Sequence, residues 1–200
     1  LVVDNENEKR LNVGIEAVID TSSQYIHNKF CVFDGKIVST GSFNPADSES
    51  KNDNNVVIYY SEVMAKNYLD EFDELYSRKF GTGEKVKTHV FALNGHIIEN
   101  YFCPEDNCAD QIIRLINESK ESIDFMYFSF TDDNIGNALL ARKDQIKIRG
   151  VFEKQQNSPA YSEYQKLLDA GIKVRVDGNK YKMHNKVMII DGKIVALGSY

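Results

Sequence analysis

The chain has 200 residues, of which 42% are hydrophobic and 27% are charged, and its formal net charge is −6. This is the profile of a globular protein, and no run approaches the ~18 consecutive apolar residues that a membrane span needs, so stable membrane insertion is not expected. The acidic balance argues against a protein that coats nucleic acid through a broad basic surface, although it permits an enzyme with one local basic pocket.

The first half of the chain predicts short strands, polar loops and one helix. Asp4–Arg10 is a polar stretch that predicts a loop or the start of a helix, and Ser61 is placed to cap a helix that runs to about Arg78. No leader precedes Leu1, which leaves the localisation open and slightly favours the cytoplasm. Strand patterns lie at 1–3, 14–19, 30–33 and 56–60, with a turn at 20–24 and a polar loop at 45–55.

The second half alternates strand and helix patterns, which predicts an α/β sheet with helices on both faces. Asn94-Gly95 joins strand patterns at 86–93 and 96–102 into a hairpin. The aromatic stretch 125–130 could stack on bases, but a buried central strand is the preferred interpretation. Helices are expected at 108–120, 132–142 (capped by Thr131) and 158–170, and strands at 122–128, 146–152 and 172–176.

The cysteines and two of the histidines give no strong functional signal. Three cysteines are few and odd in number, which disfavours a disulfide scaffold. Cys31 lies in a strand pattern and is expected to be buried. Cys103 and Cys108 favour a structural or disulfide pair over a metal site, because no histidine lies nearby in the sequence. His89 and His96 are interpreted as half-exposed strand residues.

One stretch occurs twice, at 26–44 and 183–200. The two copies share His-Asn-Lys, then Asp-Gly-Lys-Ile-Val, then Gly-Ser. Each copy has a short apolar run followed by Asp-Gly, which predicts a β-hairpin. Side chains two apart on a strand share a face, so each histidine is expected beside the lysine that follows it. Asp34 and Asp191 are interpreted first as turn formers and electrostatic partners.

The pattern H-x-K-x4-D-x6-G-S-x-N resembles the signature of the phospholipase D superfamily of phosphodiesterases, and its compact spacing resembles the nuclease-like branch. The resemblance implies a mixed β-sheet flanked by helices, with two pseudo-symmetric repeats packed around one active site. It assigns 1–80 to the C-terminal part of a first repeat, 81–87 to a linker and 88–200 to a second repeat truncated at its C-terminus. The matching positions are His27, Lys29, Asp34, Gly41, Ser42 and Asn44, and then His184, Lys186, Asp191, Gly198 and Ser199.

The same resemblance implies hydrolysis through a phosphohistidine, with no metal or cofactor. One histidine would attack phosphorus and the other would protonate the leaving oxygen, and His27 is favoured for the attack. Family members place an acidic residue near the end of the following loop to support the catalytic histidine. This chain has Asn54 or Asn55 there, a neutral amide that can fix the ring of His27 but stabilises its cation less well than a carboxylate. Lys29 and Lys186 would bind phosphate oxygens, Ser42, Asn44 and Ser199 would add hydrogen bonds, and Asp34 and Asp191 complete the catalytic set.

Three functions remain in competition. The leading one is a nuclease that acts on DNA or RNA, the second is a phospholipase or transphosphatidylase, and the third is an inactive nucleic-acid-binding module. Self-association would complete the truncated repeats. Basic residues gather just before and within the second copy, although Lys173 and Arg175 could equally protect a solvated strand edge. This basic cluster consists of Lys173, Arg175, Lys180, Lys182 and Lys186.

Overall fold

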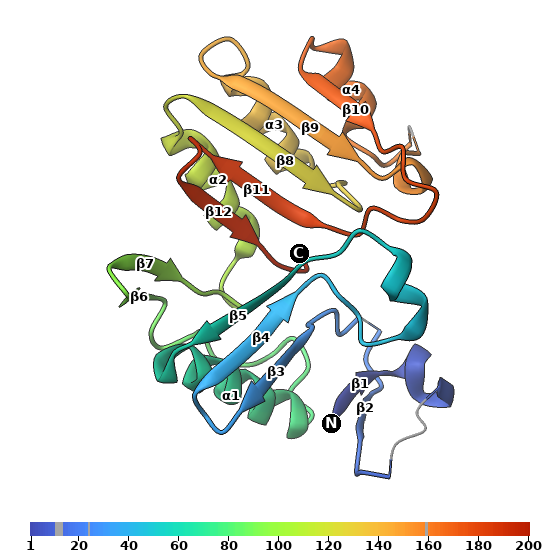
Figure 1. Cartoon of the computed structure of the whole chain (residues 1–200), viewed down its shortest axis with the longest axis vertical. Helices are drawn as coiled ribbons and strands as arrows, with labels where there is room; N and C mark the ends of the chain where they lie inside the picture. The colour runs from blue at the N-terminus through green and yellow to red at the C-terminus, as the bar shows by residue number, and fades with distance from the viewer. Residues whose placement is uncertain (11–13, 24, 159) are drawn as a thin grey trace. The chain divides into compact units, whose positions relative to one another are not determined.

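The computed structural model describes residues 1–10, 14–23, 25–158 and 160–200, and the chain divides into two compact units (Figure 1). Unit 1 comprises Leu1–Thr40, Val57–Cys108 and Tyr200. Unit 2 comprises Gly41–Val56 and Ala109–Ser199. The fold is α/β with mixed sheets and flanking helices, as the sequence predicts. Residues 11–13, 24 and 159, which fall within or beside an expected strand, turn and helix, lie outside the described residues.

Unit 1 is built from short strands and one long helix. Strands β1 and β2 pair in parallel, β3, β4 and β5 form a three-stranded sheet in that order, and β6 and β7 form the hairpin predicted around Asn94-Gly95. The Ser61 hydroxyl accepts a hydrogen bond from the Met64 amide at 3.2 Å, which confirms the predicted helix cap. The elements are β1 (Val2–Asp4), η1 (Asn5–Arg10), β2 (Val18–Asp20), β3 (Phe30–Phe33), β4 (Ile37–Gly41), β5 (Val56–Tyr60), α1 (Glu62–Tyr76), β6 (Val90–Leu93) and β7 (His96–Glu99).

The core of unit 1 lies between α1 and the β3–β4–β5 sheet. Alternate residues of β3 point to opposite faces, so Phe30 and Val32 pack against this core while Cys31 is exposed. The expectation that Cys31 is buried is therefore wrong. The buried core residues are Val38, Met64, Ala65, Tyr68 and Phe102.

Unit 2 is organised around a five-stranded sheet in the order β10-β9-β8-β11-β12. Strands β8, β9 and β10 run parallel, whereas β11 is antiparallel to both β8 and β12. No described helix of the chain is both long and apolar enough to cross a membrane. The elements are η2 (Asp47–Lys51), α2 (Cys108–Glu118), β8 (Ser122–Tyr127), α3 (Asp133–Arg142), β9 (Lys147–Phe152), η3 (Lys154–Gln156), α4 (Tyr164–Asp169), β10 (Lys173–Val176), β11 (Lys186–Ile190) and β12 (Ile194–Leu197).

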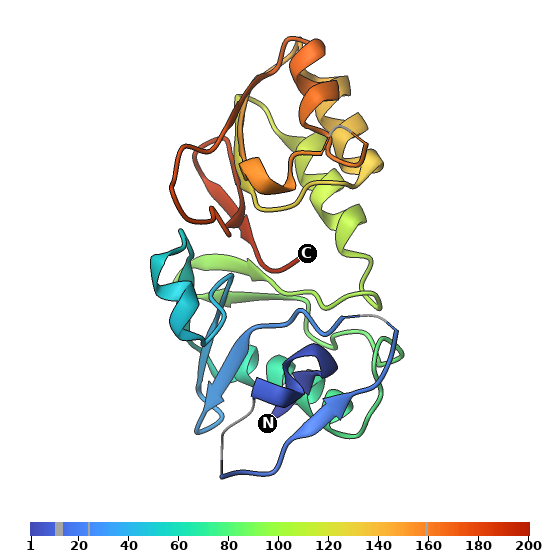
Figure 2. The same cartoon turned by 90° about the vertical axis from the view of Figure 1, so that its right-hand side faces the viewer.

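Helices α2, α3 and α4 lie on one face of the unit 2 sheet (Figure 2), rather than on both faces as the alternation of strand and helix suggested. The face toward the helices carries Phe125, Tyr127 and Phe152, all buried. Arg149 on the opposite face is exposed and pairs with Asp124 at 2.6 Å. Residues 125–127 of the aromatic stretch form the end of the central strand β8, as the preferred interpretation expects. Phe128 and Ser129 lie beyond the strand and are not fully buried.

Two helices of unit 2 begin later than predicted. Asp132 caps α3 in place of Thr131, because its carboxylate accepts hydrogen bonds from the amides two and three residues further on. The helix predicted over 158–170 is formed only at Tyr164–Asp169. Just before it, the Glu163 amide donates to the Phe130 carbonyl at 3.0 Å, which holds the chain in a turn against the core.

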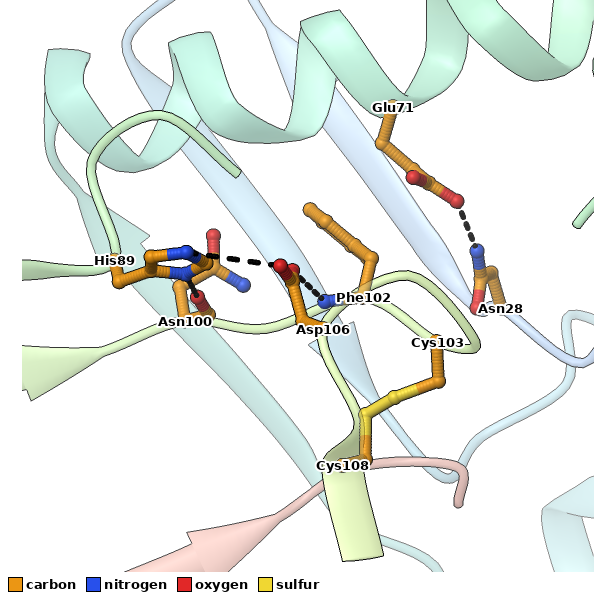
Figure 3. Close-up of a disulfide and its surroundings, with 8 residues drawn as sticks. All are labelled: Asn28, Glu71, His89, Asn100, Phe102, Cys103, Asp106 and Cys108. Atoms are coloured by element: carbon orange, nitrogen blue, oxygen red, sulfur yellow. Dashed lines mark hydrogen bonds and ion pairs between the residues drawn. A yellow bond between two sulfur atoms is a disulfide. The ribbon is translucent and has the colours of Figure 1, made fainter. Parts of the chain in front are cut away.

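Cys103 and Cys108 form a disulfide (Figure 3), which agrees with the structural or disulfide pair expected from the sequence. Within the closed loop, the buried Asp106 carboxylate accepts a hydrogen bond from the Phe102 amide at 2.9 Å. The same carboxylate lies 3.6 Å from Nε2 of His89. His89 is half-buried, as expected, but it lies just before β6 and not in a strand. Its contact with Asp106 is one that the sequence pattern did not reveal.

Replacing Gly150 by alanine is expected to destabilise the protein by about 1–3 kcal/mol through overpacking. A Cβ at this position of β9 would overlap the ring of Phe125 in the unit 2 core. Gly178→Ala is the matched control, because open space surrounds that position. Urea unfolding of both variants measures the difference, and equal stability of the two would contradict the packing described for β9.

Candidate active site

The second motif forms the hairpin that the sequence predicts. Strands β11 and β12 pair antiparallel, and the Lys193 amide closes the turn by donating to the Ile190 carbonyl at 2.9 Å. His184 and Lys186 lie side by side and are both buried. Nζ of Lys186 is 3.0 Å from Nε2 of His184 and 3.1 Å from the His184 carbonyl.

The other ring nitrogen of His184 is held by the loop 42–55. Nδ1 lies 3.0 Å from the Ser42 carbonyl oxygen and 3.1 Å from Oδ1 of Asn54. Both oxygens can only accept a hydrogen bond, so Nδ1 carries a proton. The Lys186 ammonium can only donate, so Nε2 meets it with its lone pair. The geometry therefore assigns His184 as a neutral imidazole with the lone pair on Nε2.

The Glu49 carboxylate lies close both to Nδ1 of His184 and to the Asn54 amide. Oε2 of Glu49, in the 3-10 helix η2, is 3.9 Å from Nδ1 of His184. The Asn54 amide nitrogen lies 3.4 Å from the same oxygen and 3.3 Å from the Glu49 carbonyl. The sequence placed the supporting amide at His27, whereas Asn54 contacts His184, and it missed Glu49 altogether. Position alone does not separate Glu49 from the other acidic residues of this polar loop.

The ends of the loop 42–55 are joined through Ser42. The Ser42 hydroxyl donates to Oδ1 of Asn54 at 3.1 Å and accepts from the Asn55 amide at 3.0 Å. Gly41 precedes it with φ 143°, and a Cβ there would overlap the Asn55 carbonyl. The Gly-Ser pair of the first motif thus fixes the two oxygens that hold the His184 ring. The predicted hydrogen bond from Ser42 to a phosphate remains a prediction.

Backbone pairing fixes the register between this loop and the second motif. The Asp53 amide donates to the Lys182 carbonyl, and the His184 amide donates to the Asp53 carbonyl, both at 2.8 Å. Between His184 and Lys186, the buried Asn185 side chain accepts from Asn55 at 2.8 Å and donates to the Asp53 carbonyl at 3.0 Å. The imidazole is therefore positioned from both its backbone and its ring.

Asp191 anchors the hairpin turn to the start of β8. Its carboxylate accepts hydrogen bonds from the backbone amides of Ser122 at 2.9 Å, Glu121 at 2.7 Å and Lys120 at 2.9 Å. These bonds lower the pKa of Asp191 below its ordinary value. Asp34 occupies the matching turn in unit 1 with φ 51°. Both positions agree with turn formers, and a direct part in chemistry remains a prediction for each.

The first motif, in unit 1, repeats one contact of the second. Nζ of Lys29 donates to the His27 carbonyl at 2.7 Å, as Lys186 does to His184. His27 is exposed. The Asn28 side chain between them donates to Oε1 of Glu71 on α1 at 2.9 Å (Figure 3). Burial, followed by the nearby carboxylates of Glu105 and Glu74, raises the pKa of Glu71 to about 7.

The remaining predicted residues are only partly enclosed. Asn44 and Ser199 are half-buried, and their predicted contacts with phosphate remain predictions. Phe128 belongs to the aromatic stretch 125–130, for which base stacking is only the second interpretation from the sequence. Its ring packs edge-on against the His184 imidazole with centroids 4.6 Å apart. Within the described ranges, no three histidine, cysteine, aspartate or glutamate side chains are grouped so that they could hold a metal ion.

The fold and the paired motifs define a class of protein, an α/β domain that carries two copies of an H-x-K-x4-D hairpin. The family model described as "Cardiolipin synthase, PLD-like domain" matches residues 3–76 and 112–200. The chain therefore belongs to the phospholipase D superfamily.

Three similar proteins illustrate the family and the fold. A phospholipase D of Rickettsia prowazekii is 31% identical over 112 residues, which are 56% of this chain and 55% of the relative. A mitochondrial cardiolipin hydrolase of Xenopus tropicalis is 38% identical over 66 residues, 32% of this chain and 31% of the relative. Polyphosphate kinase from Porphyromonas gingivalis shares the fold at a TM-score of 0.54 and 11% identity, over 90% of this chain and 30% of the kinase. The chain thus spans about half the length of the Rickettsia relative, or less for the other two.

Replacing Glu71 by glutamine is expected to remove a pH-dependent loss of stability. The pKa of Glu71 is higher in the folded protein than in the unfolded chain, so wild-type stability falls as the pH rises from about 4.5 to 7. The difference is about 1–2 kcal/mol after allowance for solvent screening. Thermal unfolding should show that Glu71→Gln is more stable than the wild type at pH 8 but not at pH 5.

The exposed Asp73 on the same helix supplies the control, since Asp73→Asn should track the wild type at both pH values. An equal gain of Glu71→Gln at pH 5 and pH 8 would contradict the raised pKa.

Proposed function

We propose that this chain is a phosphodiesterase that breaks phosphodiester bonds through a phosphohistidine, without a metal ion. The observation that carries the proposal is the His184 imidazole, whose Nδ1–H is held by two oxygens while its Nε2 lone pair faces the Lys186 ammonium. A nucleophile at phosphorus needs a lone pair and a nearby cation, because the anionic oxygens of the diester repel attack. The His184 site supplies both within 3.0 Å.

In the first step, the Lys186 ammonium moves from Nε2 of His184 to the non-bridging oxygens of the phosphate, which frees the lone pair. Nε2 then bonds to phosphorus as the bond to the leaving oxygen breaks. Lys186 neutralises the non-bridging oxygens, and a phosphate in turn offsets the cost of burying this ammonium. His27, by its motif, donates a proton to the leaving oxygen. Water then attacks phosphorus and returns a proton to His27 as the N–P bond breaks.

We assign the attack to His184, although the sequence favoured His27. His184 is buried and its tautomer is fixed, whereas His27 is exposed. Lys29, Asn44 and Ser199 keep the phosphate contacts that their motif positions predict. Ser42 instead supports the loop that orients His184, because its hydroxyl donates its one proton to Asn54. Asp34 and Asp191 keep the hairpins in shape, and Asp191 does so through its three backbone amides.

For the substrate, we favour a nucleic acid. Lys51, Lys180 and Lys182 are exposed on segments that adjoin His184, which makes a local basic patch on an acidic chain. A phospholipid is the second candidate, and the names of the relatives, phospholipase D and cardiolipin hydrolase, favour it. Labelled single-stranded DNA, a DNA duplex and vesicles of phosphatidylcholine with cardiolipin, tested side by side, separate the two.

The roles of the two histidines can be separated with bis(p-nitrophenyl) phosphate in the presence of EDTA. Its leaving group needs no proton, so His27→Ala should still release one equivalent of p-nitrophenol and accumulate phosphohistidine at position 184. His184→Ala should release none. Mass spectrometry of the trapped peptide identifies the modified residue.

Phosphohistidine found at position 27 would reverse the assignment. Wild-type activity lost completely in EDTA would contradict metal-independent chemistry. His96→Ala, at an exposed histidine of the unit 1 hairpin, is the control and should turn over like the wild type.

Replacing Glu49 by glutamine should lower kcat by about 10- to 100-fold, because the carboxylate steadies the amide that orients His184. The acid limb of the activity profile should also move to lower pH, since a protonated imidazole loses a negative neighbour 3.9 Å away. Asp47→Asn, on the exposed side of the same 3-10 helix, is the control. A fall in activity with an unchanged pH profile would reduce Glu49 to a purely structural role.

A further inference from the structure

Tyr181 is an exposed aromatic residue that no part of the proposed chemistry uses. It precedes His184 by three residues, and 40% of its surface is accessible. The ammonium groups of Lys51 and Lys180 lie 5.6 and 5.7 Å from its ring centroid. Both lysines are exposed, so their flexible side chains can move from the ring to a ligand.

Phe128 is a second aromatic ring with lysines near it, and it contacts the His184 imidazole. Phe128 is half-buried, and the Lys186 and Lys182 ammonium groups lie 5.0 and 6.0 Å from its centroid. Its edge contact with the His184 imidazole places this ring directly beside the proposed nucleophile. We name the set of Tyr181, Phe128, Lys51, Lys180 and Lys182 the aromatic–lysine strip.

The strip is held in register with His184. The backbone pairing of Asp53 with Lys182 and His184 spans the segment between Tyr181 and the imidazole. Asn179 fixes the start of this segment, because its side chain accepts from the Tyr181 amide at 2.9 Å and donates to the Asp53 carboxylate at 2.6 Å. The carboxylate of Asp53 is thereby engaged with a neutral group instead of with the lysines. Three residues of chain span at most ~11 Å, so Tyr181 lies within a few nucleotides of the imidazole.

Aromatic rings interleaved with lysines match one class of ligand best. Single-stranded nucleic acids bind through bases stacked on aromatic side chains and phosphates paired with basic ones. A duplex keeps the faces of its bases inside its own stack, and a lipid headgroup offers no planar ring. We propose that the aromatic–lysine strip binds single-stranded nucleic acid, with a base stacked on Tyr181 and a neighbouring phosphodiester at His184. This inference rests on the proposed function for the second of these contacts.

The test measures the binding of a fluorescein-labelled 12-nucleotide single strand by anisotropy, in a His184→Ala background that prevents cleavage. Tyr181→Ala should raise the Kd about 5- to 100-fold, the value of one stacked base. Tyr181→Phe keeps the ring and should stay within about twofold. Tyr161→Ala removes another exposed tyrosine of unit 2 and should leave the Kd unchanged.

The dependence of single-strand binding on salt concentration tests the lysines of the strip. Lys180→Ala should reduce the slope of log K against log salt concentration by about 0.7, because one phosphate contact is lost. An unchanged slope would overturn the proposal that the strip pairs its lysines with the phosphates of a single strand. This variant changes only an exposed side chain, so it keeps the proposal testable if Tyr181→Ala folds poorly.

The proposal would be overturned if Tyr181→Ala bound the single strand with an unchanged Kd. It would also be overturned if Tyr181→Ala lost binding only to phosphatidylcholine–cardiolipin vesicles. The wild type is assayed in parallel on bis(p-nitrophenyl) phosphate, which carries no base. A wild type that binds the strand through Tyr181 but cleaves no diester would refute the proposed function and leave the strip standing. If the wild type cleaves the diester but Tyr181→Ala does not weaken binding of the single strand, the proposed function stands and the aromatic–lysine strip is refuted.

Discussion

The candidate active site of unit 2 depends on one constraint, the clamp on the His184 imidazole. Two oxygens that can only accept hold Nδ1, and an ammonium that can only donate meets Nε2. A ring clamped in this way has one tautomer and one orientation. Both the proposed attack on phosphorus and the placement of the aromatic–lysine strip depend on that orientation.

The clamp explains why the surrounding chain is shaped as it is. Gly41 lets the Asn55 carbonyl approach closely, and the Ser42 hydroxyl ties the loop ends, so the Ser42 carbonyl and Asn54 reach the ring. Lys186 is buried beside it, which is unfavourable for an ammonium unless negative charge or hydrogen bonds compensate. Its hydrogen bonds to Nε2 and to the carbonyl of His184 offset part of that cost.

The sequence predicts those parts of the fold and site that depend on local signals. Asp-Gly after an apolar run predicts both hairpins, period-two spacing predicts that Lys186 lies beside His184, and Ser61 predicts the α1 cap. It does not predict which loop supports which histidine. Asn54 and Glu49 reach His184 from about 130 residues away through tertiary packing, and no spacing rule reports such a pairing. Cys31 and the late start of α4 were mispredicted because strand faces and tertiary contacts decide them.

The most direct test of the clamp is long-range 1H–15N correlation NMR at neutral pH on protein labelled with 15N in its four histidines, with the His184 signals assigned through His184→Ala. The clamp requires a protonated Nδ1 and an unprotonated, lone-pair-bearing Nε2 in His184. A proton on Nε2, alone or together with Nδ1, would contradict it.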